Sequence, residues 1–173
     1  MNQSQAASLA ALGAVGAGSV GVGTAYATGA FDAKYLNFDD YVKNGGKYRY
    51  IGSTSEDTSS DPTAENIKKL IKEPATKNLY KDFLKGKIKD MSVSGVQTND
   101  KPGNDDISKI GESGDSNDTI TGKAASFVSK WCIEKKQSKP SSNDGKTKFK
   151  EKEITSAGEW STFEKLCLEK LPN

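Results

Sequence analysis

The chain contains two cysteines and no histidine, and this composition limits the chemistry open to it. Cys132 and Cys167 each lie beside an apolar face in a segment with hydrophobic residues at helical spacing. Packing of these faces would bring the two sulfurs together. In an oxidising compartment a disulfide would then close a loop of about 35 residues and contribute roughly 3 to 4 kcal/mol of stability. Two buried free thiols are the alternative.

Other catalytic arrangements find little support in the sequence. Without histidine, a cysteine lacks its commonest activating base, and two cysteines are too few for a structural zinc site of the usual kind. The charged runs at 134–136 and 151–153 are typical of solvated faces, because no apolar neighbour in the sequence would shift their pKa values. A formal dinucleotide fingerprint at 16–21 lacks the following strands and helices that would give it meaning. We therefore expect a non-enzymatic protein with no cofactor and no metal.

Two amphipathic segments must position the cysteines. Residues 124–136 and 160–171 both carry apolar side chains at helical spacing, so we predict a helix in each. A loop, a turn and a short strand near 148–154 are expected between them. The large aromatic residues on the two faces are candidates for core packing: Phe127, Trp131, Trp160 and Phe163.

The remaining polar segment, 32–173, predicts one small helix-rich α+β domain with long flexible loops. A short strand is expected at 47–51. Asp61 followed by Pro62 predicts a helix start, and Pro74 should end or kink that helix, giving one bent helix or two. Residues 97–121 contain too few apolar groups to offset the entropic cost of ordering them, so we predict a flexible stretch there.

The first 31 residues carry no charged side chain, and this tract forms the other predicted unit of the chain. It is long enough to cross a bilayer, which takes about 20 residues as a transmembrane helix, although its Gly and Ala content makes insertion only modestly favourable. Residues 25–27 offer a small-x-small pattern that a signal peptidase accepts, but no basic residue precedes the tract. We favour an uncleaved membrane anchor over a signal segment, with the lipid bilayer as its partner.

The polar domain has nearly balanced charge. The chain carries 25 basic and 23 acidic residues, and Arg49 is its single arginine, which argues against binding to nucleic acid. Lys34, Lys43 and Lys47 also follow the uncharged tract, and basic flanks of this kind favour retention on the cytoplasmic side. Long domains translocate largely regardless of such charges, so both orientations stay open.

The uncharged Ala/Gly/Val opening, the Lys- and Asn-rich body and the pairing of Trp131-Cys132 with Trp160, Phe163 and Cys167 resemble the large paralogous sets of short uncharacterised proteins of hemotropic mycoplasmas. This resemblance implies a membrane-associated, surface-displayed protein of a wall-less bacterium, with an antigen or host-contact role. It implies no catalytic or binding residue. We therefore expect a non-enzymatic membrane-anchored protein with an extracellular polar domain and an unidentified host or other protein partner; the alternative is a cytoplasm-facing, membrane-tethered interaction module.

Overall fold

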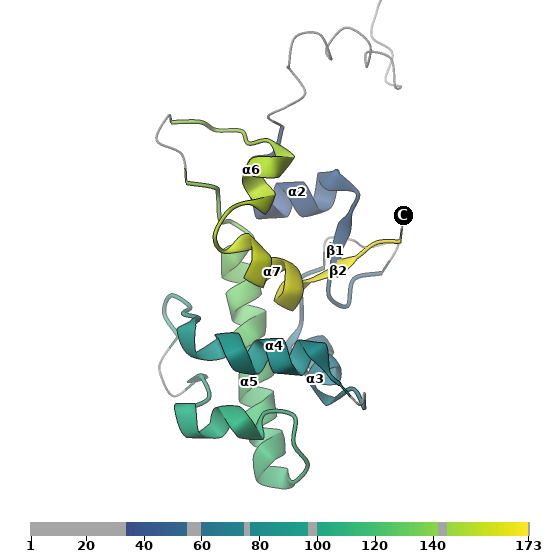
Figure 1. Cartoon of the computed structure of the whole chain (residues 1–173), viewed down its shortest axis with the longest axis vertical. Coiled ribbons are helices and arrows are strands. Elements are labelled where there is room, and N and C mark those ends of the chain that lie inside the picture. Colours follow the sequence, from purple (N-terminus) through teal and green to yellow (C-terminus); the bar gives the residue numbers. More distant parts are fainter. Residues whose placement is uncertain (1–33, 55–59, 75–76, 97–99, 142–144, 173) are drawn as a thin grey trace, which may run out of the picture. The chain divides into compact units, whose positions relative to one another are not determined.

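The computed structural model describes residues 34–54, 60–74, 77–96, 100–141 and 145–172 (Figure 1). The chain divides into two units, Met1–Phe31 and Asp32–Asn173, and the structure describes residues of the second. The predicted anchor therefore lies outside the described residues. Among the described residues, no helix has both the length and the apolar character needed to cross a membrane.

The described unit is helix-rich and has one small antiparallel sheet. Its elements follow the chain in this order: α2 (Phe38–Gly45), β1 (Tyr48–Tyr50), α3 (Ala64–Lys72), α4 (Leu79–Lys87), the 3-10 helices η2 (Ile88–Asp90) and η4 (Asn104–Lys109), α5 (Asp115–Lys135), α6 (Glu151–Thr155), α7 (Trp160–Cys167) and β2 (Leu168–Lys170). This arrangement confirms the predicted helix-rich α+β class for the polar domain.

The long helix α5 forms the centre of the hydrophobic core. Its buried residues recur at helical spacing from Thr121 to Cys132, so one face of the helix is covered along three turns. Small residues at positions 121, 124 and 125 let α3 approach this face, where Ile67 and Ile71 are fully buried. Figure 1 shows α5 running past α3 and toward α7, which packs on the later turns of α5.

A buried asparagine joins α3 to α4. Asn78 caps α4 by accepting a hydrogen bond from the backbone N–H of Lys81, 2.9 Å away. Its side-chain amide donates to the carbonyls of Leu70, Ile71 and Glu73 at the end of α3. The stretch around Pro74 is therefore two helices, not one bent helix. The helix start predicted with Asp61 as its N-cap was wrong: Thr63 caps α3, and Asp61 forms an ion pair with Lys136.

The sheet joins the two ends of the described unit. Strands β1 and β2 are antiparallel, with Tyr48 opposite Lys170 and Tyr50 opposite Leu168. The predicted helix at 160–171 therefore ends at Cys167, because pairing with β1 satisfies the backbone of the next three residues. The predicted strand at 148–154 was also wrong: Phe149 makes a single bridge to Tyr35, and α6 follows it.

The predicted flexible stretch at 97–121 is largely structured where it is described. Residues 104–109 form η4, and α5 begins at Asp115, nine residues before the predicted helix start. Ile110 is fully buried, and the neighbouring Gly111 N–H donates to the hydroxyl of buried Thr121 at 2.8 Å. Gly111 has a φ of +74°, and a Cβ there would lie 3.0 Å from the Ile71 carbonyl oxygen. Buried Ile110 and the hydrogen bond from Gly111 to Thr121 thus hold this segment in place, although it contains few apolar residues.

Candidate functional site

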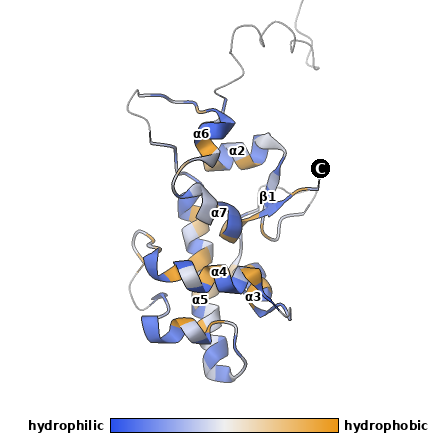
Figure 2. Ribbon diagram, in the orientation of Figure 1, coloured by the Kyte–Doolittle hydropathy of each residue, from blue (hydrophilic) through white to orange (hydrophobic). Residues whose placement is uncertain are grey.

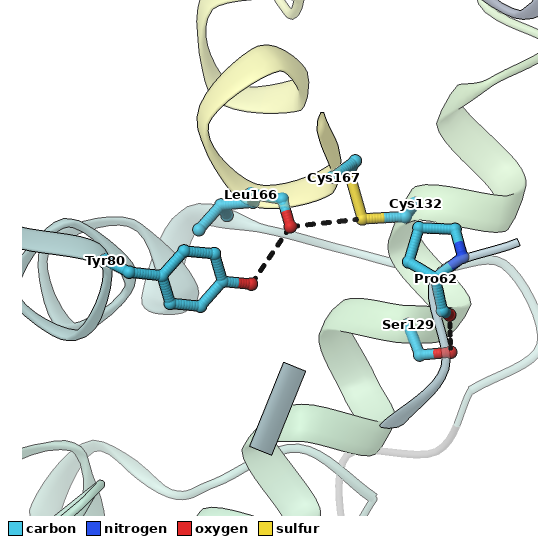
Figure 3. The surroundings of a disulfide bond; sticks show 6 residues. All are labelled: Pro62, Tyr80, Ser129, Cys132, Leu166 and Cys167. Carbon is cyan, nitrogen blue, oxygen red and sulfur yellow. Dashed lines mark hydrogen bonds between the residues drawn. A yellow bond between two sulfur atoms is a disulfide. The ribbon is translucent and has the colours of Figure 1, made fainter. Parts of the chain in front are cut away.

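The two cysteines form a disulfide that links α5 to the end of α7 (Figure 3). The Cα atoms of Cys132 and Cys167 lie 5.6 Å apart, within the 4.4 to 6.8 Å range expected for a disulfide. Both residues are fully buried. Neither sulfur is a thiolate, so the pair supplies no nucleophile and no metal ligand in this state.

The backbone around the disulfide is held by hydrogen bonds from several elements. The Leu166 carbonyl accepts from the Tyr80 hydroxyl of α4 at 2.9 Å, and the Cys167 carbonyl accepts from the Ile51 N–H after β1 at 2.9 Å. The Leu166 oxygen also lies 3.8 Å from the Cys132 sulfur, which is a close contact because a disulfide sulfur carries no proton. Figure 3 shows the Tyr80 hydroxyl and the disulfide meeting at this one carbonyl.

An aromatic cluster packs around Trp160 at the start of α7. The Trp160 ring centroid lies 5.1 Å from that of Phe38, 5.2 Å from Tyr41 and 5.8 Å from Phe163. The first two pairs are edge-to-face, which is a favoured arrangement for aromatic rings. Trp160 therefore ties α7 to α2, which lies more than one hundred residues earlier in the chain.

Three tyrosines of this region each donate a hydrogen bond to a carboxylate. Tyr41 bonds Glu151 at 3.0 Å, Tyr48 bonds Glu164 at 2.9 Å and Tyr50 bonds Asp39 at 2.8 Å. Burial, followed by the hydrogen bond to Glu164, raises the pKa of Tyr48 to about 12. Burial and the bonded carboxylates likewise hold the pKa values of Tyr41 and Tyr50 well above the usual range, so these hydroxyls stay protonated donors at neutral pH.

Glu151 has 44% of its side chain exposed, so it is solvated as the sequence indicated, but its hydrogen-bond partners shift its pKa, which the sequence did not indicate. Its carboxylate forms an ion pair with Lys47 and accepts a hydrogen bond from the Tyr41 hydroxyl, next to the aromatic cluster. The hydrogen bond from Lys47, with a smaller contribution from Tyr41, lowers the pKa of Glu151. The group is therefore held as an anion, which suits an ion-pair role and not a proton donor.

The structure brings most of the sequence-predicted site residues together. Trp131 and Phe163 have ring centroids 6.5 Å apart, and both lie in the same core as the disulfide. Phe127 is also buried, but one turn earlier on α5, where the Lys101 ammonium lies 5.4 Å from its ring centroid.

Sequence reasoning missed the tyrosine–carboxylate pairs. Two of them join residues 110 and 116 positions apart, so no local spacing indicated them. Within the described part of the chain, no group of three or more His, Cys, Asp or Glu side chains is placed to hold a metal ion. In the described part of the chain, this region joins distant segments through ring packing and the disulfide. Its three tyrosine hydroxyls each donate a hydrogen bond to a carboxylate.

Comparison of the chain with protein-family models, curated proteins and solved structures found no match. The functional argument therefore depends on the sequence and on the geometry described above.

Proposed function

We propose that the protein is a non-enzymatic, membrane-anchored protein whose polar domain is displayed on the outer face of the cell. There it would serve as an antigen or in contact with a host component. The uncharged tract at 1–31 would hold the chain in the bilayer, and the Asp32–Asn173 unit would be the displayed part.

The buried disulfide is the observation that carries this proposal. Disulfides persist in oxidising environments outside the cell and are rare where thiols are kept reduced. Cys132 and Cys167 are the only cysteines of the chain, and they meet in the domain core with geometry suited to a bond. Stabilisation of a small polar domain by such a bond fits an exported location.

The absence of an enzymatic role is supported by how the reactive groups are used. The chain has no histidine, and its two sulfurs are bonded to each other. The Tyr41 hydroxyl near Trp160 is held protonated, while its partner Glu151 is held as an anion by Lys47. Neither Tyr41 nor Glu151 is therefore suited to exchange a proton near neutral pH, which agrees with the proposed non-enzymatic role.

A cytoplasm-facing tethered module is the second candidate, and the basic residues after the uncharged tract favour it. Lys34, Lys43, Lys47 and Arg49 lie within 20 residues of Phe31, where they influence orientation most. In that compartment the disulfide would be reduced, so the two candidates differ in a measurable property of the same cysteines.

Protease treatment of intact cells tests the orientation. We expect a protease added outside to remove the domain while a cytoplasmic control protein stays intact. Detection should use an antibody against a segment within 100–141. Protection of the domain until the cells are permeabilised would overturn surface display and support the tethered module.

A separate carbonate extraction tests the anchor: full-length protein should stay with the membranes, and release into the soluble fraction would contradict an anchor.

A further inference from the structure

Helix α4 leaves part of its apolar surface uncovered beside α7. Leu84 and Ile88 of the α4–η2 segment are fully buried, whereas Leu79 at the start of α4 is 67% exposed. The uncovered side borders a half-open cavity of about 550 Å³ lined by Lys77, Leu79, Tyr80, Asp82, Phe83 and Lys165. We call this the α4 groove. Figure 2 shows hydrophobic and hydrophilic residues alternating along α4, as expected for a helix with two different faces.

The α4 groove has a fixed wall. The Tyr80 hydroxyl is bonded to the Leu166 carbonyl beside the disulfide, so this ring cannot swing away without breaking that bond. The ammonium of Lys165 lies 4.7 Å from the Phe83 ring centroid, which holds a positive charge against the apolar surface. An apolar surface and a cation therefore lie side by side on one preformed site.

The charge of the α4 groove favours an anionic ligand. Within the described part of the chain, neither Lys77 nor Lys165 forms an ion pair, whereas Lys81 on the same helix pairs with Glu112. The single acid of the groove is Asp82, so the lining has an excess of positive charge. An anionic group that follows an apolar chain would complement both features.

We propose that the α4 groove binds a single-chain lipid carboxylate, a long-chain fatty acid. Its acyl chain would lie along Leu79, Tyr80 and Phe83, and its carboxylate would accept hydrogen bonds from Lys165 and Lys77. The cavity volume falls within the roughly 300 to 1,000 Å³ typical of small-molecule sites. A stable protein partner would need to bury about 800 Å² of surface on each side of the interface, and three apolar side chains do not provide that area. The inference goes beyond the proposed function and holds for either orientation of the domain.

Site-mapped photolabelling of the full-length chain tests this proposal. The chain is reconstituted in phosphatidylcholine nanodiscs, mixed with a photoreactive analogue of hexadecanoate, irradiated and digested, and the labelled peptides are mapped by mass spectrometry. Mapping separates labelling of the groove from labelling of the tract at 1–31. We expect label in the peptides that contain 77–83 and 160–167, and we expect hexadecanoate to compete at least tenfold better than dodecanoate or hexadecanol, because chain burial and the charged head both contribute.

Two pairs of matched variants locate the site. Leu79→Asp places a negative charge, which repels the ligand carboxylate, at an exposed position of the α4 groove. It should reduce groove labelling at least tenfold. Leu36→Asp alters another exposed leucine outside the groove and should leave the labelling unchanged. Lys165→Met should reduce labelling about tenfold through loss of the charge-assisted hydrogen bond, and Lys170→Met should not.

Circular dichroism would verify that each variant keeps its fold. Absence of label from the groove peptides, or equal labelling in the groove variants and their controls, would overturn the proposal. Equal competition by hexadecanol and hexadecanoate would also overturn it, because the lysines would then have no part in binding.

Discussion

Removal of the disulfide should cost a large part of the stability of the polar domain. The bond joins residues 35 positions apart, and for a loop of that length the chain-entropy relation gives an unfolded-state entropy loss of about 13 cal/mol/K, or roughly 4 kcal/mol at 25 °C. Alanine is the suitable replacement, because serine would place hydroxyl groups in a fully buried site. The Cys132→Ala/Cys167→Ala variant should therefore unfold with a Tm lower by roughly 8 to 16 °C.

The assay is thermal unfolding followed by near-ultraviolet circular dichroism, which reports on the buried rings of Trp131 and Trp160. Each single alanine variant should lose nearly as much stability as the double variant, since either change removes the same bond. A reductant should destabilise the wild-type chain but leave the double variant unchanged. The reasoning would be refuted if the free energy of unfolding of the double variant lay within about 1 kcal/mol of the wild-type value. The disulfide-closed loop would then impose little restriction on the unfolded chain.

Three further changes test other parts of the core. Trp160→Ala should destabilise the domain by about 3 to 5 kcal/mol, measured by urea unfolding, and Trp160→Phe should cost clearly less because a ring stays in the cluster. Asn78→Ala should cost about 1 to 3 kcal/mol by the same assay, and Asn78→Asp should cost more, because its carboxylate would face the three carbonyls that the amide now bonds. Hydrogen bonds from Lys68 and Lys72 lower the pKa of Asp118 from 3.8 to about 2, so its stabilising effect is present above pH 4 and is lost as the pH falls toward 2. The urea midpoint of Asp118→Asn should therefore fall less than that of wild type between pH 5 and pH 2, and an equal fall in both proteins would contradict the ion-pair assignment.

The helices with a clear hydrophobic period were the most predictable part of the fold. The spacing around Trp131 and Cys132 indicated the later half of α5, and that around Trp160 and Phe163 indicated α7. The same spacing placed each cysteine beside an apolar face, so a close approach of the sulfurs was one of the two alternatives that the sequence left open.

Features fixed by distant contacts were not predictable in the same way. The first turns of α5 carry few apolar residues, and they are held by contacts such as that of Asp118 with Lys68 across to α3. Residues 168–170 continue a helical pattern in the sequence, but pairing with β1 makes them a strand. The α4 groove exists because Leu79 faces outward while Leu84 faces the core, a difference that depends on the packing of α3 and α7 around α4.

The redox state of the two cysteines in the native cell is the most direct test of the proposed exported domain. Cells would be quenched in acid, and the denatured protein would be treated with an alkylating agent before and after reduction. The mass of the protein would then be measured by mass spectrometry after each treatment. We predict that Cys132 and Cys167 take up no alkyl group before reduction and two after it. Two alkyl groups added without reduction would contradict an exported, disulfide-bonded domain and would favour a domain that faces the cytoplasm.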